Sequence, residues 1–147
     1  MAMYGRLAAS LAVSGVTMYV LAFSQIDLLD HFELSLSVLW ITVSMVSAMG
    51  LIMIVAMWPM LPRPRFNVAL AAVFALLLGG AFAASRTEAL VGDDAFLRSM
   101  IPHHSRAIHM CQEAGLTDPE IEELCTQIIQ TQRDEIALMR SIMERRG

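Results

Sequence analysis

A short run of metal-binding residue types stands out in the last third of the chain. The segment Met100-Ile101-Pro102-His103-His104 places two adjacent imidazoles one helical turn after a thioether, and three of the four histidines lie between Met100 and Met110. Imidazole and thioether together suit soft or borderline metals, above all copper. The first question is therefore whether these residues can form a copper site or only a helix.

The histidines fall on the apolar face of a predicted helix. That face repeats at helical spacing through Phe96, Met100, His103/His104, Ala107, Met110/Cys111 and Ala114. Counting residues along both helices away from a turn near Leu116 places Gln132 and Glu135 of the next helix opposite the histidines. Glu135 can accept a hydrogen bond from a ligating imidazole and so fix its tautomer. The structural alternative is that one histidine caps a carbonyl freed by Pro102 and the other is solvated.

Other sulfur atoms share this face. Met139 and Met143 are an i, i+4 pair, for which core filling is the simpler interpretation. Cys111 and Cys125 point inward but lie a few residues out of level. We expect buried, inert thiols rather than ligands or a disulfide.

Two helices must position these residues. We expect them over about 94–114 and 118–145, separated by Gly115, with Thr117 and Glu120 as a capping box. Their short connection makes them antiparallel neighbours. Two helices cannot bury both of their faces, so we expect a homodimer that completes a four-helix bundle.

The first half of the chain is apolar. No charged residue occurs in Leu7–Ile26, Leu34–Pro62 or Phe66–Ser85, and each run reaches the roughly 20 residues that a membrane-spanning helix needs. The expected fold is all-α: a three-span region over residues 1–85, with spans at about 7–26, 35–58 and 66–84, followed by a helical hairpin over residues 86–147.

The flanking charges orient these spans. Arg6, Arg63 and Arg65 predict a cytoplasmic N-terminus and a cytoplasmic second loop, which place the hairpin outside the cytoplasm. The first loop carries Asp27, Asp30, His31 and Glu33, which can attract cations, but a solvated turn explains the loop equally well. The expected location is the cell membrane, with the C-terminal domain periplasmic.

Methionines recur in the second span. Met45, Met49, Met53 and Met57 follow one another at intervals of four residues. Such a row can pass Cu(I) through a membrane, but a lipid-facing or helix-packing stripe is the simpler interpretation.

Several function classes are excluded. The tail holds eleven acidic and seven arginine residues, so nucleic acid is not an expected partner. The chain has no Glu-x-x-His pair for a di-iron bundle, no His-Glu-x-x-His, no phosphate-binding glycine loop and no nucleophile elbow. We expect a protein that is not an enzyme.

The tail resembles a known family. Residues 94–110 read DAFLRSMIPHHSRAIHM, residues 118–121 read DPEI, and residues 128–139 read IIQTQRDEIALM. These segments resemble the bacterial DUF305 family (domain of unknown function 305), and the apolar half is similar to its membrane-anchored members. One departure is Arg106, where the family pattern has a small residue.

The resemblance implies a ferritin-like helical bundle and, by analogy with some periplasmic members, copper bound through methionine and histidine in copper tolerance. By motif position it implies a set of metal ligands and two supporting residues. The ligands are Met100, His103, His104, Met110, Met139 and Met143, and the supporting residues are Gln132 and Glu135.

The sequence thus leads to one main hypothesis and two rivals. The main hypothesis is a membrane-anchored extracytoplasmic protein that binds a copper ion for buffering, handover or tolerance. Cu(I) is the favoured oxidation state, and the histidine pair also allows Cu(II). The first rival is copper transport along the methionine row of the second span. The second rival is a dimerisation module without a metal.

Overall fold

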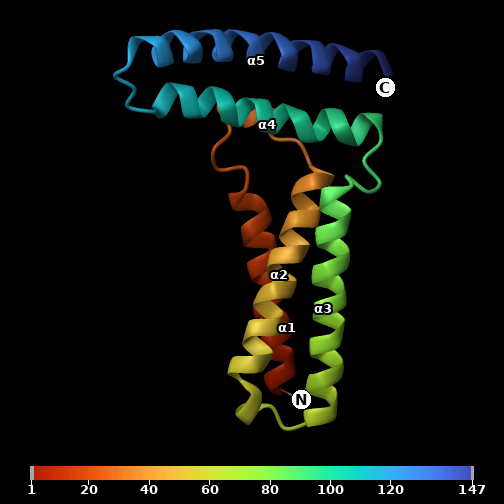
Figure 1. Cartoon of the computed structure of the whole chain (residues 1–147). Coiled ribbons are helices and arrows are strands. Elements are labelled where there is room, and N and C mark those ends of the chain that lie inside the picture. The colour runs from red at the N-terminus through yellow and green to blue at the C-terminus, as the bar shows by residue number, and fades with distance from the viewer. Residues whose placement is uncertain (1, 147) are drawn as a thin grey trace. The chain divides into compact units, whose positions relative to one another are not determined.

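The computed structural model describes residues 2–146, and these residues form helices and connections without a strand. The elements are α1 (Ala2–Leu21), η1 (Leu29–His31), α2 (Leu36–Ala56), η2 (Trp58–Met60), α3 (Pro64–Arg86), α4 (Asp93–Glu113) and α5 (Pro119–Arg146) (Figure 1). The expected all-α class is confirmed.

The chain divides into two compact units. Unit 1 comprises residues 1–21 and 37–90, and unit 2 comprises residues 22–36 and 91–147. Unit 1 therefore holds α1, α2 and α3, while unit 2 holds the α4–α5 hairpin. The division differs in one respect from the expected boundary near residue 85, because the connection between α1 and α2 clusters with the hairpin.

In unit 1, α1, α2 and α3 lie side by side (Figure 1). Its core is an apolar cluster of Leu7, Leu11, Ile54 and Leu61. Gly50 lets α2 approach α3 closely, since a Cβ at this position would stand 2.9 Å from the ring of Phe74. These contacts fix α1 and α3 against α2.

Polar contacts close both ends of unit 1. At one end, Tyr4 donates a hydrogen bond of 2.7 Å from Oη to Oδ1 of Asn67, which is 1% exposed. At the other end, the indole of Trp40 donates to the carbonyl of Ala89 at 2.9 Å. That bond holds the turn after α3, where Glu88 and Leu90 adopt left-handed φ angles of 47° and 65°.

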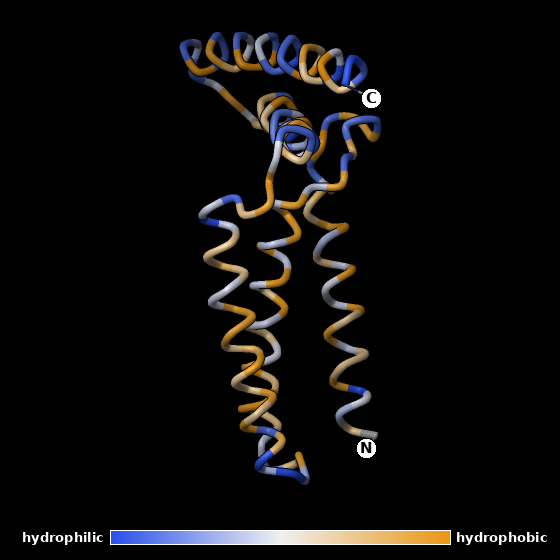
Figure 2. Tube along the Cα trace, turned by 90° about the vertical axis from the view of Figure 1, so that its right-hand side faces the viewer, coloured by the Kyte–Doolittle hydropathy of each residue, from blue (hydrophilic) through white to orange (hydrophobic). Residues whose placement is uncertain are grey.

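Two helices, not three, are long and apolar enough to cross a membrane among residues 2–146: α2 and α3. The expectation of a third span over residues 7–26 is wrong. The helix ends at Leu21, so its last five expected residues lie outside it. The helix also carries Arg6 and the hydroxyl residues Ser10, Ser14 and Thr17, which lower its hydropathy. Figure 2 shows apolar residues along α2 and α3 and hydrophilic ones at their connection.

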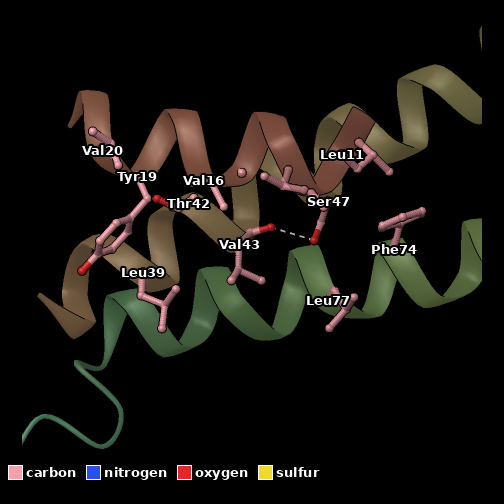
Figure 3. A pocket seen from close by; sticks show the side chains of 13 residues that line it. Leu11, Val16, Tyr19, Val20, Leu39, Thr42, Val43, Ser47, Phe74 and Leu77 are labelled. Atoms are coloured by element: carbon pink, nitrogen blue, oxygen red, sulfur yellow. Dashed lines mark hydrogen bonds between the residues drawn. The ribbon is translucent and has the colours of Figure 1, made fainter. Parts of the chain in front are cut away.

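A cavity of about 410 Å³ lies among the helices of unit 1 (Figure 3). Its walls are almost entirely apolar, and they include Leu39, Val43 and Leu77. The hydroxyls of Thr42 and Ser47 donate to carbonyls one turn earlier, at 2.8 and 2.7 Å, and so offer no free donor. The cavity is therefore suited to an apolar filling and not to a polar substrate.

Unit 2 is built on the antiparallel pair α4 and α5. Its apolar cluster contains Leu97, Ile101, Ile108, Ile136 and Met139. The helix α4 runs through Pro102 without ending, as its apolar pattern predicts. The expected caps differ in detail, because Asp118 and not Thr117 caps α5. Its Oδ1 accepts from the backbone N–H of Glu120 at 2.9 Å.

A disulfide joins the two helices of the hairpin. Cys111 of α4 and Cys125 of α5 are bonded, with their Cα atoms 5.3 Å apart. The expectation of inert thiols is therefore wrong. The sequence prediction assumed that both helices stay regular up to the turn, which put the two cysteines at different heights along the hairpin. In the structure α4 ends at Glu113 and an extended connection follows, so the register between the helices differs. A disulfide is typical of an oxidising compartment.

This crosslink is predicted to stabilise the hairpin. Closing a loop of this size (sequence separation 14) lowers the entropy of the unfolded chain by an amount worth about 3 kcal/mol. The variant Cys111→Ser/Cys125→Ser should therefore melt at a lower temperature than the oxidised protein, as followed by circular dichroism. The reductant dithiothreitol should lower the melting temperature of the wild type and leave the variant unchanged. Equal melting temperatures for oxidised wild type and variant would contradict the prediction.

Candidate functional site

His104 is the best-positioned of the predicted ligands. Its side chain is 11% exposed, and both ring nitrogens have partners. Nδ1 lies 2.8 Å from the carbonyl oxygen of Met100, one turn earlier on α4. Nε2 lies 2.8 Å from Oε2 of Glu135 on α5. Gln132 donates to the same carboxylate oxygen at 3.3 Å.

The contact with the Met100 carbonyl locates one proton of the ring. A nitrogen that faces a carbonyl oxygen can only donate, so Nδ1 carries a proton. Nε2 is then the nitrogen available to a metal, and the Met100 carbonyl is the group that orients the ring. The contact between Nε2 and Glu135 requires one further proton, on either the ring or the carboxyl group. Glu135 thus faces the nitrogen that a metal would use, whereas the sequence analysis gave it the orienting role.

The other predicted ligands are less closely gathered. His103 is exposed, and its ring centroid lies 5.9 Å from that of His104. Met100 and Met143 pack against the same apolar cluster that contains Met139. Core packing accounts for all three of these methionines, which is the simpler interpretation of the i, i+4 pair.

Met110 lies apart from this group. It is 60% exposed and lines a cavity of about 310 Å³ together with Gln25, His109 and Glu113. The structure therefore brings His104, Glu135 and Gln132 together, places His103 beside them and leaves Met110 elsewhere.

Histidine, cysteine and carboxylate side chains do not by themselves form a complete metal site among the described residues. Within residues 2–146, no three side chains of histidine, cysteine, aspartate or glutamate converge. His104 and Glu135 supply two donors. Further donors must come from a thioether, from a rearranged His103 or from a second chain.

The four methionines of the predicted row in the second span lie in two different environments. Met49, Met53 and Met57 pack against the core cluster of unit 1, whereas Met45 is half exposed. Helix packing therefore accounts for most of the row. Copper transport along it stays a prediction.

A buried polar contact beside His104 was not predicted. Ser105 is fully buried, and His31 of η1 is 6% exposed. The backbone N–H of Asp27 donates to Oγ of Ser105 at 2.8 Å, and Oγ lies 2.8 Å from Nδ1 of His31. With His31 neutral and its proton on Nε2, the Ser105 hydroxyl donates to Nδ1. The expectation that this loop is a solvated turn is wrong for His31.

Charged pairs flank this contact. Arg140 of α5 binds Asp30 with an N···O distance of 2.6 Å, and Arg98 of α4 binds Glu33 at 2.7 Å. The acidic side chains Asp30 and Glu33 of the loop thus pair with arginines of the hairpin.

A sequence signal for the buried hydroxyl exists, since Ser105 shares a helix face with Ile101 and Ile108, which are both fully buried. No local pattern, however, identifies its partner 74 residues away.

The surroundings of His31 favour its neutral form. Burial lowers the pKa of His31 below its usual 6.5, and the nearby Arg140 cation lowers it further. Asp27 and Asp30 act in the opposite direction. The net effect is a lowered pKa.

Residues 83–143 match the family described as "Domain of unknown function (DUF305)". The matched segment covers less than half of the chain. It contains α4, most of α5 and the last turn of α3. The family description states no ligand, so the copper site stays a prediction.

One viral protein is similar to part of this chain. "Uncharacterized protein L153" of Acanthamoeba polyphaga mimivirus is 45% identical over 65 residues, which is 43% of each chain. The match thus spans less than half of that relative. Because the relative is viral, it gives no indication of a bacterial source. No solved structure matches the chain.

Unit 2 is predicted to lose stability in acid through His31. A histidine whose folded pKa is lowered stabilises the fold above its unfolded pKa of 6.5, and this contribution is lost as the pH falls from 6.5 toward the folded value. The melting temperature of the wild type should therefore fall between pH 7 and pH 5. The variant His31→Asn, whose amide oxygen can still accept from Ser105, should show a smaller fall. An equal fall in both proteins would exclude His31 as the cause.

Proposed function

We propose that this protein is membrane-anchored and binds copper through its DUF305 domain, for buffering, handover or tolerance. The observation that carries the proposal is the state of His104. Its Nδ1 is held by a backbone carbonyl, and its Nε2 is directed at a carboxylate in a nearly buried position. This arrangement orients a ligating imidazole before the ion arrives. Copper is here a cargo, and no catalytic step is proposed.

The proposed ligand set is narrower than the one the family resemblance implies. His104 supplies Nε2, and a copper ion there takes the place of the proton shared with Glu135. His103 is adjacent in the chain and free to turn inward from its exposed position. Met100 supplies the thioether that is nearest to the histidines in sequence. Its backbone carbonyl also contacts His104. Met110, Met139 and Met143 are left out of this set.

The proposed location follows from α2 and α3. As an antiparallel pair of spans, they leave residues 22–36 and residues 87–146 on the same side of the membrane. Arg63 and Arg65 between them favour a cytoplasmic connection, which makes the opposite side extracytoplasmic. The Cys111–Cys125 disulfide supports the same orientation, because disulfides persist in oxidising compartments.

A second copy is the proposed source of the missing donors. The hairpin leaves large apolar side chains half or more exposed: Phe96, Met110, Leu124 and Leu138. Pairing two hairpins through such side chains would form a four-helix bundle and bring two exposed His103 side chains to one assembly.

The ligand role of the histidines predicts a loss of affinity on their removal. In the full-length protein in detergent, His103→Ala/His104→Ala should bind Cu(I) at least about tenfold more weakly than the wild type, since losing even an outer-shell partner of a ligating histidine has an effect of this size. A competition titration against a Cu(I) chelator measures the affinity. Affinity should also rise with pH, because copper displaces a proton at Nε2.

The matched control is His109→Ala, which removes a histidine of the same helix outside the site. It should bind copper as the wild type does. If the double variant and the control have the same affinity as the wild type, the proposed copper site is wrong.

The dimer can be tested separately from the metal. Light scattering coupled to size-exclusion chromatography should give a dimer in chelator-treated buffer, because apolar contact drives the pairing. The variant Leu124→Glu/Leu138→Glu should shift the protein to a monomer, whereas Glu122→Gln/Glu123→Gln should not. A monomer for the wild type, with and without copper, would contradict the proposal.

A further inference from the structure

Four methionines converge on one cavity of unit 1, away from the DUF305 hairpin in sequence. The cavity measures about 280 Å³. Its lining residues are Met3, Arg6, Leu7, Ser10, Met53, Met57 and Met60. Four of these seven residues therefore carry a thioether.

The local structure explains the convergence. Met53 lies in the last turn of α2, and Met57 follows the helix directly, where its N–H still donates to the carbonyl of Met53 at 2.9 Å. The short helix η2 then turns the chain back, with the N–H of Met60 donating to the carbonyl of Met57 at 2.9 Å. Met3 comes from α1, which Leu7 anchors in the core cluster.

The lining chemistry selects one class of ligand. It contains no carboxylate, imidazole or thiol, so it offers nothing to hard cations such as Mg²⁺ or Ca²⁺. Thioethers are soft, neutral donors that select Cu(I) and similar ions. Arg6 is exposed at this cavity, and its charge repels a divalent ion about twice as strongly as a monovalent one.

Helix packing accounts for part of this arrangement, because Met53 and Met57 contact the core cluster of unit 1, but it does not account for the open volume beside them. Methionines that fill a core leave little space between them, whereas these four border an open volume of about 280 Å³. Met60 is also 60% exposed, so it contributes little to the core.

We propose that this cavity binds a soft monovalent metal ion, Cu(I) or Ag(I), through the thioethers of Met3, Met53, Met57 and Met60. The site lies at the end of α2 that leads into Arg63 and Arg65. It is independent of the His104 site, since it shares no residue with it.

The test uses Ag(I), which needs no reductant, and the full-length protein in detergent. Isothermal titration gives the number of ions bound and their affinity. The variant Met53→Leu/Met57→Leu removes two thioethers with nearly conserved volume. It should lose one equivalent of Ag(I), or bind that equivalent at least about tenfold more weakly, in line with the loss of groups that support a metal site.

Two further variants make the result specific. Met18→Leu/Met45→Leu removes two methionines of α1 and α2 that do not line the cavity, and it should bind Ag(I) as the wild type does. Met60→Leu changes an exposed position that carries little risk to folding, and it should weaken the same equivalent. If both cavity variants retain the number of ions and the affinities of the wild type, the site is not there.

The two metal proposals can be tested independently of each other. His103→Ala/His104→Ala should retain the Ag(I) equivalent of the cavity, and Met53→Leu/Met57→Leu should retain the copper affinity of the hairpin. If the histidine variant alone removes the Ag(I) equivalent, the cavity proposal is overturned and the hairpin binds that ion.

Discussion

The hydroxyl of Ser105 is the contact on which the arrangement of the hairpin unit depends. It is fully buried, it accepts from the backbone of Asp27, and it pairs with a buried ring nitrogen of His31. A buried polar group without a hydrogen-bond partner would destabilise the fold. Each of the three groups therefore depends on the other two being in place. Through them, a connecting segment becomes part of the packed structure around α4.

This contact also bears on the candidate metal site. Ser105 follows His104 directly, and the two side chains leave α4 in different directions: one toward Glu135 of α5 and the other toward His31. Both faces of this helical turn are thereby held. The ring of His104 is oriented by the Met100 carbonyl, one turn earlier on the same helix, while the turn that carries it is fixed by the loop. A rigid turn of this kind keeps a ligating nitrogen in place.

Much of the architecture could be predicted from local patterns. The two hairpin helices, the continuity of α4 through Pro102 and the meeting of His104 with Glu135 follow from helical periodicity and register. The failures have physical causes. The end of α1 at Leu21 is not marked by any charge, the Cys111–Cys125 bond depends on an irregular turn, and the Ser105–His31 contact joins residues 74 positions apart. Periodicity describes faces of helices, and it contains no information about which distant loop covers a face.

The two ends of the hairpin are held by interactions of different kinds. Near the turn, Cys111 and Cys125 are joined covalently. At the far end, Arg146 reaches Asp93 and Asp94 at 3.2 and 2.9 Å, but all three side chains are well exposed. Exposed ion pairs contribute little and are screened by salt. Fraying therefore starts at the open end, and amide hydrogens there exchange with solvent earlier than those beside the disulfide, the more so at high ionic strength.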